Sequence, residues 1–320
     1  MRVAVFGAGG FLGAWTVRAL LAAGHDVVGV VRPTTDLWRV GGLPALTLIS
    51  QASEEWPSIV ERGRFEIVML LDWEGVASST RNDEIQWSNL ERHRLLVEAA
   101  AEAGVRRVVG LGSQAEYGAR TNRSDEESPT NPETTYGEAK VAAMLQLRNQ
   151  CELLGLAWVW ARVFSVYGPM DNAGMLLASI AGSLGSNVDV ALSSGQQRWS
   201  YLYASDAGAA LATLATAAQA GGIVNVGHPI APPLREIVEQ FASNFDSGGR
   251  LLFAPAPADP SEIAHLEPAT LRLLALGWTP EVSQAHGLST TADWLTGHGV
   301  TDPYFASLQL PRPAGAREQN

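Results

Sequence analysis

A glycine-rich turn near the start of the chain limits the fold more than any other feature of the sequence. The turn follows RVAVF, a short valine-rich run typical of a strand buried on both faces, and leads into a helically spaced apolar segment that ends at Gly24. A second buried run, DVVGVV, comes next. The glycines of the turn are Gly7, Gly10 and Gly13. Between a strand and a helix this spacing predicts a turn that holds the pyrophosphate of a dinucleotide; the alternative is that the glycines only make the turn.

The residue at the end of the second strand indicates which dinucleotide is bound. A site for NAD usually has a carboxylate there to accept the ribose hydroxyls, whereas a site for NADP offers arginine to the 2′-phosphate. Here Arg32 follows Val31, and no carboxylate stands at that place. We therefore expect NADP as the cofactor, with NAD as the alternative. The competing interpretation is that Arg32 is a solvated surface side chain.

Strands continue to alternate with helices along the first half of the chain. The pattern predicts a strand over 65–71, a long helix over 84–104 and another strand over 106–113, which ends in Ser113. This order is typical of an α/β chain with a Rossmann-type, doubly wound parallel sheet. Ligands of such sheets bind at the carboxyl ends of the strands, which is where Ser113 is placed.

Composition excludes several classes of partner. The net charge of −11 leaves no basic surface for nucleic acid, and the single cysteine, Cys151, rules out an internal disulfide. The six histidines are scattered without helical pairing, which argues against a metal site. No apolar stretch reaches membrane-spanning length, and no targeting segment is evident. We expect a cytoplasmic protein with neither nucleic acid nor a membrane as partner.

Lys140 is the only lysine among 22 basic residues. It follows Tyr136 by four positions in a helix predicted over 134–154, so the two side chains share one helix face. An ammonium close to a phenol favours the phenolate, and we expect Lys140 to lower the pKa of Tyr136 toward neutrality. A tyrosine tuned in this way exchanges a proton with a carbonyl or an alcohol, and Ser113 can hold the same oxygen. A compact ammonium can also reach the hydroxyls of a ribose, which the bulkier arginine does less well.

These residues lie within segments that resemble a known family. The segments are GAGGFLG, GLGSQAEYG, YGEAK, RVFSVYGP, GQQRWSYLYASDA and LGWTP with TTADWL, and they are spread over nearly the whole chain. They are similar to the extended short-chain dehydrogenase/reductases, in particular to the nucleotide-sugar epimerases, dehydratases and reductases. The resemblance implies an NAD(P)-dependent enzyme with a nucleotide-sugar substrate. It also implies a homodimer formed through helices 84–104 and 134–154.

The resemblance assigns roles to individual residues. It implies a catalytic triad of Ser113, Tyr136 and Lys140, with Tyr136 as the general acid or base. The implied cofactor site consists of Gly7, Gly10, Phe11, Leu12, Gly13, Arg32, Leu71, Asn89, Tyr136, Lys140 and Val163. The implied substrate site consists of Gln114, Ser165 and Arg198, with Arg198 on the diphosphate of the nucleotide sugar.

The positions after Ser113 narrow the reaction. Dehydratases of this family carry Thr-Asp-Glu here, since elimination of water needs an acid and a base, whereas this chain has Ser113, Gln114 and Ala115. Glu116 lies one position further, where we expect a structural role rather than contact with the sugar. Arg32 favours NADPH-dependent reduction of a nucleotide-linked 4-keto-6-deoxyhexose; the alternative is an NAD-dependent 4-epimerase. A non-catalytic cofactor-binding protein fits poorly, because such relatives usually lack Tyr-x-x-x-Lys.

Two stretches depart from the family pattern. Asp72 and Trp73 stand where the family usually has small residues near the nicotinamide ribose. Ser50 or Gln51 stands where an aspartate near the adenine is common. Trp73 either narrows the cofactor site or simply packs, as most tryptophans do.

The resemblance implies a smaller, mixed C-terminal lobe that binds the substrate. We expect a dinucleotide-binding domain over 1–168, to which 201–225 returns, and a substrate lobe over 169–200 and 226–300. Residues 301–320 are polar and contain proline, which predicts a tail over the surface.

Overall fold

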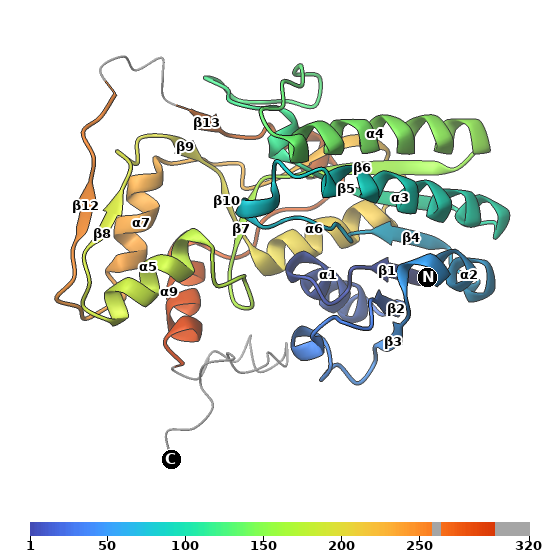
Figure 1. The fold of residues 1–320 in the computed structure, drawn as a ribbon, viewed down its shortest axis with the longest axis horizontal. Coiled ribbons are helices and arrows are strands. Elements are labelled where there is room, and N and C mark those ends of the chain that lie inside the picture. The colour runs from blue at the N-terminus through green and yellow to red at the C-terminus, as the bar shows by residue number, and fades with distance from the viewer. Residues whose placement is uncertain (258–263, 298–320) are drawn as a thin grey trace.

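A seven-stranded sheet forms the centre of the computed structural model, which describes residues 1–257 and 264–297. The strand order is β11-β6-β5-β4-β1-β2-β3, and every neighbouring pair is parallel (Figure 1). The strands are β1 (Arg2–Phe6), β2 (Asp26–Val31), β3 (Thr47–Ser50), β4 (Ile67–Leu70), β5 (Arg107–Ser113), β6 (Ala157–Val163) and β11 (Gly222–Val226). The predicted α/β fold with a Rossmann-type parallel sheet is confirmed.

Helices cover both faces of this sheet. One face carries α1 (Phe11–Ala22) and α6 (Ala204–Thr216), and the other carries α2 (Trp56–Gly63), α3 (Ile85–Glu102) and α4 (Thr135–Leu154). Alternate strand residues serve opposite faces: Val3 and Val5 of β1 belong to the first core, and Ala4 and Phe6 belong to the second. Because both faces are buried, strands such as β1, β2 and β4 are nearly continuous apolar runs, which made them visible in the sequence.

The helix that carries Tyr136 and Lys140 has clear signals at both ends. Thr134 caps its start, accepting a hydrogen bond from the main-chain nitrogen of Gly137 at 3.2 Å. Gly155 ends it with a φ of +72°, a left-handed conformation that glycine adopts without strain. Helix α4 therefore lies where the sequence predicted it.

Shorter elements form the smaller part of the molecule, with α5, α7 and α9 to one side of the sheet (Figure 1). They are the helices α5 (Leu176–Gly185), α7 (Leu234–Ala242), α8 (Leu271–Ala275) and α9 (Gln284–Leu295) and the parallel pairs β7 (Ser165–Tyr167) with β10 (Tyr201–Tyr203), β8 (Val190–Leu192) with β12 (Leu251–Phe253), and β9 (Arg198–Trp199) with β13 (His265–Leu266). The division into domains near residue 168 stays a prediction, and the predicted tail over 301–320 lies outside the described residues. None of the helices in the described parts combines the length and apolar character needed to cross a bilayer.

Candidate active site

The glycine turn between β1 and α1 has a shape that side chains would prevent. Gly7 has a φ of +83°, and its main-chain nitrogen donates to the oxygen of Val30 at 3.0 Å. A Cβ on Gly13 would lie 2.1 Å from the oxygen of Gly7, closer than real Cβ contacts. Gly10 stands at the N-cap of α1 without a side chain, so the first N–H groups of the helix offer donors to an anion. These residues fit the pyrophosphate of a dinucleotide.

A cleft of about 340 Å³ lies beside this turn, at the carboxyl ends of β1, β2 and β4. Its walls include nine residues predicted to bind the cofactor: Gly7, Gly10, Phe11, Leu12, Gly13, Arg32, Leu71, Tyr136 and Lys140. Two further predicted cofactor residues lie elsewhere. Val163 is opposite Ser113 in the register of β5 and β6, and Asn89 is buried behind the loop that follows β4. The cleft therefore brings the glycine turn and the Tyr-x-x-x-Lys pair to one site.

The pKa of Tyr136 does not follow the prediction made from the sequence, and the reason is that both Tyr136 and Lys140 lose contact with water. Lys140 is 2% exposed and donates from Nζ to the main-chain oxygen of Leu111 at 2.7 Å. Burial lowers the pKa of this lysine to about 7, so only part of it is charged at neutral pH. Burial also raises the pKa of Tyr136, and this outweighs the opposing effects of a hydrogen bond with Ser113 and the charge of Arg81. The prediction that Lys140 lowers the pKa of Tyr136 is wrong, because desolvation dominates for both groups.

Trp73 lines the cleft and also packs against the core beneath it. Its ring centroid lies 3.5 Å from Nζ of Lys140, a cation–π contact, and its indole meets the ring of Tyr136 edge to face at 6.2 Å. The indole nitrogen donates to Oε1 of Gln86 at 2.7 Å. Gln86 is fully buried and donates in turn to the main-chain oxygen of Gly75 at 2.7 Å. The interpretation that Trp73 narrows the site fits this geometry.

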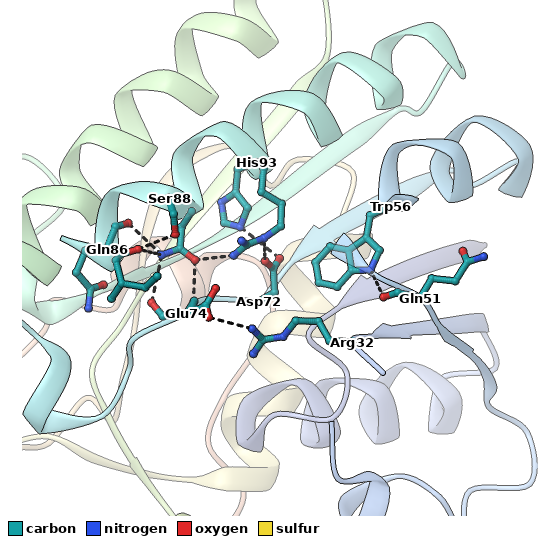
Figure 2. A network of polar contacts seen from close by, with 11 residues as sticks. Arg32, Gln51, Trp56, Asp72, Glu74, Gln86, Ser88 and His93 are labelled. Atoms are coloured by element: carbon teal, nitrogen blue, oxygen red, sulfur yellow. Dashed lines mark hydrogen bonds and ion pairs between the residues drawn. The ribbon is translucent and has the colours of Figure 1, made fainter. Parts of the chain in front are cut away.

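Side chains from α3 hold the loop that follows β4 (Figure 2). Asp72 accepts from Nε of Arg92 at 2.7 Å and lies 3.2 Å from Nε2 of His93. Burial alone would raise the pKa of Asp72, but His93 and Arg92 together hold it well below its usual range. Asn89 bonds the main chain of Glu74 on both sides, accepting from its nitrogen at 2.7 Å and donating to its oxygen at 3.2 Å. The loop is therefore fixed by tertiary contacts.

Arg32 is in an ion pair with this loop. Its Nη1 lies 3.4 Å from Oε1 of Glu74, and both side chains are about half exposed (Figure 2). Both residues line the cleft. Arg32 is thus neither a free anion-binding group nor only a solvated surface charge. Glu74 was not predicted as a site residue, because its local sequence does not indicate a contact with Arg32. Arg32 follows β2, whereas Glu74 follows β4.

Glu116 lies behind the turn that begins at Ser113. Its side chain is fully buried; Oε1 accepts from the nitrogen of Ser113 and from Nε1 of Trp160, both at 2.9 Å. Oε2 accepts from Nε of Arg162 at 2.7 Å. The predicted structural role of Glu116 is confirmed, because every one of these partners is a buried or partly buried group of the fold. The carboxylate fixes the start of the turn that carries Ser113.

The predicted substrate residues are only partly brought together. Nε2 of Gln114 donates to Oγ of Ser165 at 3.2 Å, so these two side chains lie side by side. Arg198 is exposed on β9 and donates to the main-chain oxygen of Ala231 at 3.3 Å. No hydrogen bond among the described residues joins Arg198 to Gln114 or Ser165, and its role toward a diphosphate stays a prediction.

The chain is similar to a known protein family and to individual proteins of known name. A model described as "NAD dependent epimerase/dehydratase family" matches residues 3–227. The dTDP-D-glucose 4,6-dehydratase of Mus musculus is 26% identical over 68% of this chain, which spans 63% of that protein. The dTDP-6-deoxy-L-talose 4-dehydrogenase (NAD(P)(+)) of Kitasatospora kifunensis is 28% identical over 87% of this chain and 91% of that protein. The solved UDP-glucose 4-epimerase of Thermus thermophilus, in complex with NAD, is 26% identical, with a TM-score of 0.77 over 93% of this chain and 99% of that one.

Proposed function

Since the chain belongs to the NAD dependent epimerase/dehydratase family of the extended short-chain dehydrogenase/reductases, we propose that it reduces a nucleotide-linked keto sugar with NADPH. The substrate class is a 4-keto-6-deoxyhexose on a nucleoside diphosphate. The observation that carries the proposal is a cleft whose walls contain both the glycine turn and Tyr136 with Lys140. Relatives named for the 4-position of nucleotide-linked sugars support the choice of substrate.

The cleft offers one group to each part of the cofactor. The N–H groups at the start of α1 bind the pyrophosphate, Arg32 binds a 2′-phosphate, and Lys140 binds the hydroxyls of the nicotinamide ribose. When bound, the nicotinamide supplies the hydride. Trp73 lays the face of its ring against Nζ of Lys140, where this cation–π contact stabilises the ammonium.

Tyr136 is suited to give a proton rather than to take one. Because burial raises the pKa of Tyr136, its phenol is protonated at neutral pH and can donate from Oη to the carbonyl oxygen of the substrate. Ser113 holds the same oxygen with its hydroxyl. The charge of Arg81, 5.3 Å from the ring centroid, then stabilises the phenolate that remains. Reduction of a keto sugar needs the protonated phenol of Tyr136, whereas oxidation of a sugar alcohol needs its phenolate as the base.

The second candidate is a nucleotide-sugar 4-epimerase that retains NAD. It is favoured by the pairing of Arg32 with Glu74, which places a carboxylate at the expected 2′-phosphate site. The relative in complex with NAD is named as an epimerase. Dehydration is disfavoured, because Gln114 and Ala115 supply neither an acid nor a base. A homodimer through α3 and α4 and a cytoplasmic location complete the proposal.

The test is the oxidation of NADPH in the presence of a dTDP-linked 4-keto-6-deoxyhexose. We expect Tyr136→Phe to reduce the turnover by about 100- to 10,000-fold, because the proton donor is lost. Tyr167→Phe is the matched control; its hydroxyl donates to the main-chain oxygen of Gln284, outside the cleft. Interconversion of 4-epimers without net consumption of NADPH would contradict reduction and support the epimerase.

A further inference from the structure

Both arginines in the walls of the cleft are paired with carboxylates of one loop. Arg92 pairs with Asp72 at 2.7 Å, and these side chains are 15% and 8% exposed. Arg32 pairs with Glu74 at 3.4 Å, and these are 47% and 43% exposed. Both pairs line the cleft, but the first is mostly buried, whereas the second is about half exposed and can open to solvent. The Arg32–Glu74 pair is therefore the one that can respond more readily to a charged group of the cofactor.

Glu74 is held where it reaches Arg32. The fully buried Asn89 bonds both the main-chain nitrogen and the oxygen of Glu74, so the backbone at this residue is fixed against α3. The next residue, Gly75, has a φ of +85°, and a Cβ there would lie 2.6 Å from Nε2 of Gln86. In Figure 2 the carboxylate of Glu74 points across to the guanidinium of Arg32. The loop thus delivers a negative charge to the end of β2.

The carboxylate of Glu74 beside Arg32 has opposite effects on the binding of the two dinucleotides: it disfavours NADP and favours NAD. The 2′-phosphate of NADP is close to doubly charged, and it must displace Glu74 or share Arg32 with a like charge. The 2′-hydroxyl of NAD is a donor, and a carboxylate accepts from it, which is the part an acidic residue at the end of β2 takes in NAD sites. Arg32 alone would favour NADPH; Glu74 offsets that preference.

We propose that Glu74 is a specificity-determining residue that sets the balance between NADPH and NADH. The pair with Arg32 opens for NADPH and stays closed for NADH, so the chain accepts both dinucleotides. This inference rests on the proposed function only in requiring that the cleft binds a nicotinamide dinucleotide. It does not depend on which sugar is the substrate or on the direction of the reaction.

The experiment is a titration of the full chain with NADPH and with NADH, measured by isothermal calorimetry, for the wild type and three variants. Glu74→Gln releases Arg32, and we expect the ratio of NADPH to NADH affinity to rise about fivefold. This rise should shrink in high salt, because the groups are exposed. Arg32→Gln should lower the same ratio. Glu239→Gln is the matched control: it breaks an equally exposed pair with Arg235, at 2.7 Å, and changes the net charge by the same amount.

The outcomes separate the inference from the proposed function. A raised ratio in Glu74→Gln with no change in Glu239→Gln supports the inference. Binding of both dinucleotides with the same ratio in wild type and Glu74→Gln overturns the inference and leaves the proposed function standing. A failure of the wild type to bind either dinucleotide overturns both.

Discussion

Two loops line the cleft from neighbouring strands, and they are shaped by opposite means. The glycine turn after β1 owes its form to missing side chains, since a Cβ on Gly7 or Gly13 would meet main-chain atoms within 3 Å. The loop over 71–75 after β4 owes its form to added bonds from the buried side chains of Gln86 and Asn89, and from Arg92. The difference teaches how each loop can be disrupted. The first loses its conformation when a side-chain atom is added, and the second loses it when a hydrogen bond or ion pair is removed.

The largest effect is expected from adding one methyl group to the glycine turn. In Gly13→Ala the new Cβ would lie 2.1 Å from the oxygen of Gly7, so the turn and helix α1 must separate. We expect NADPH and NADH affinity to fall at least about 100-fold, as measured by calorimetry. Gly182→Ala is the control, because a Cβ there meets no atom within 4 Å among the described residues. Unchanged binding in Gly13→Ala would contradict the steric account of the turn.

The next effect is expected from removing one charge from the second loop. Asp72→Asn leaves Arg92 without its carboxylate in a partly buried place, and we expect unfolding in urea to require about 3 kcal/mol less free energy. Asp26→Asn is the matched control. Asp26 also pairs with an arginine, Arg2, at 2.7 Å, but its side chain is 55% exposed, so we expect a loss below about 1 kcal/mol.

The loss of stability in Asp72→Asn has a defined pH dependence. The folded pKa of Asp72 lies well below its ordinary value, so below about pH 4 the unfolded chain binds more protons than the folded one. The stability that Asp72 contributes is therefore complete at neutral pH and falls as the pH drops through the acid range. The difference between wild type and Asp72→Asn should shrink there, and a difference that stays constant down to about pH 3 would contradict the buried-pair account.

The smallest effect is expected from the aromatic contact of the second loop. Trp73→Leu removes the ring 3.5 Å from Nζ of Lys140, which should lower the pKa of Lys140 further below about 7, by about half a unit to one unit. Because the chain has one lysine, isotope-labelled lysine gives one side-chain NMR signal whose pH titration reports this pKa directly. Trp73→Phe keeps a ring and should shift it less. An equal shift in both variants would show that the ring face is not what stabilises the ammonium.

Features that depend on residues close in the sequence could be predicted, whereas contacts between residues far apart in the sequence could not. Strands β1, β2, β4 and β5, helix α4 and the glycine turn follow from local spacing, and the structure has them close to the predicted residues. The partners of Asp72 lie in α3, and no local pattern connects them with it. The position of Arg32 was clear, but its pairing with Glu74 was not. The pKa of Tyr136 was predicted in the wrong direction, because burial of a side chain is a tertiary property.

Strand β1 is synthesised first but stands between strands that come later. It pairs with β2 on one edge, with Val3 opposite Val27, and with β4 on the other, with Val3 opposite Ile67. Its second edge therefore lacks a partner until β4 has left the ribosome, and parallel pairing then requires closure of a long segment of chain. The cleft is complete later still, since Tyr136 and Lys140 belong to its walls. A growing chain that has formed only the glycine turn lacks the later walls of the cleft, so a ligand that needs the whole cleft stabilises chains extended beyond α4.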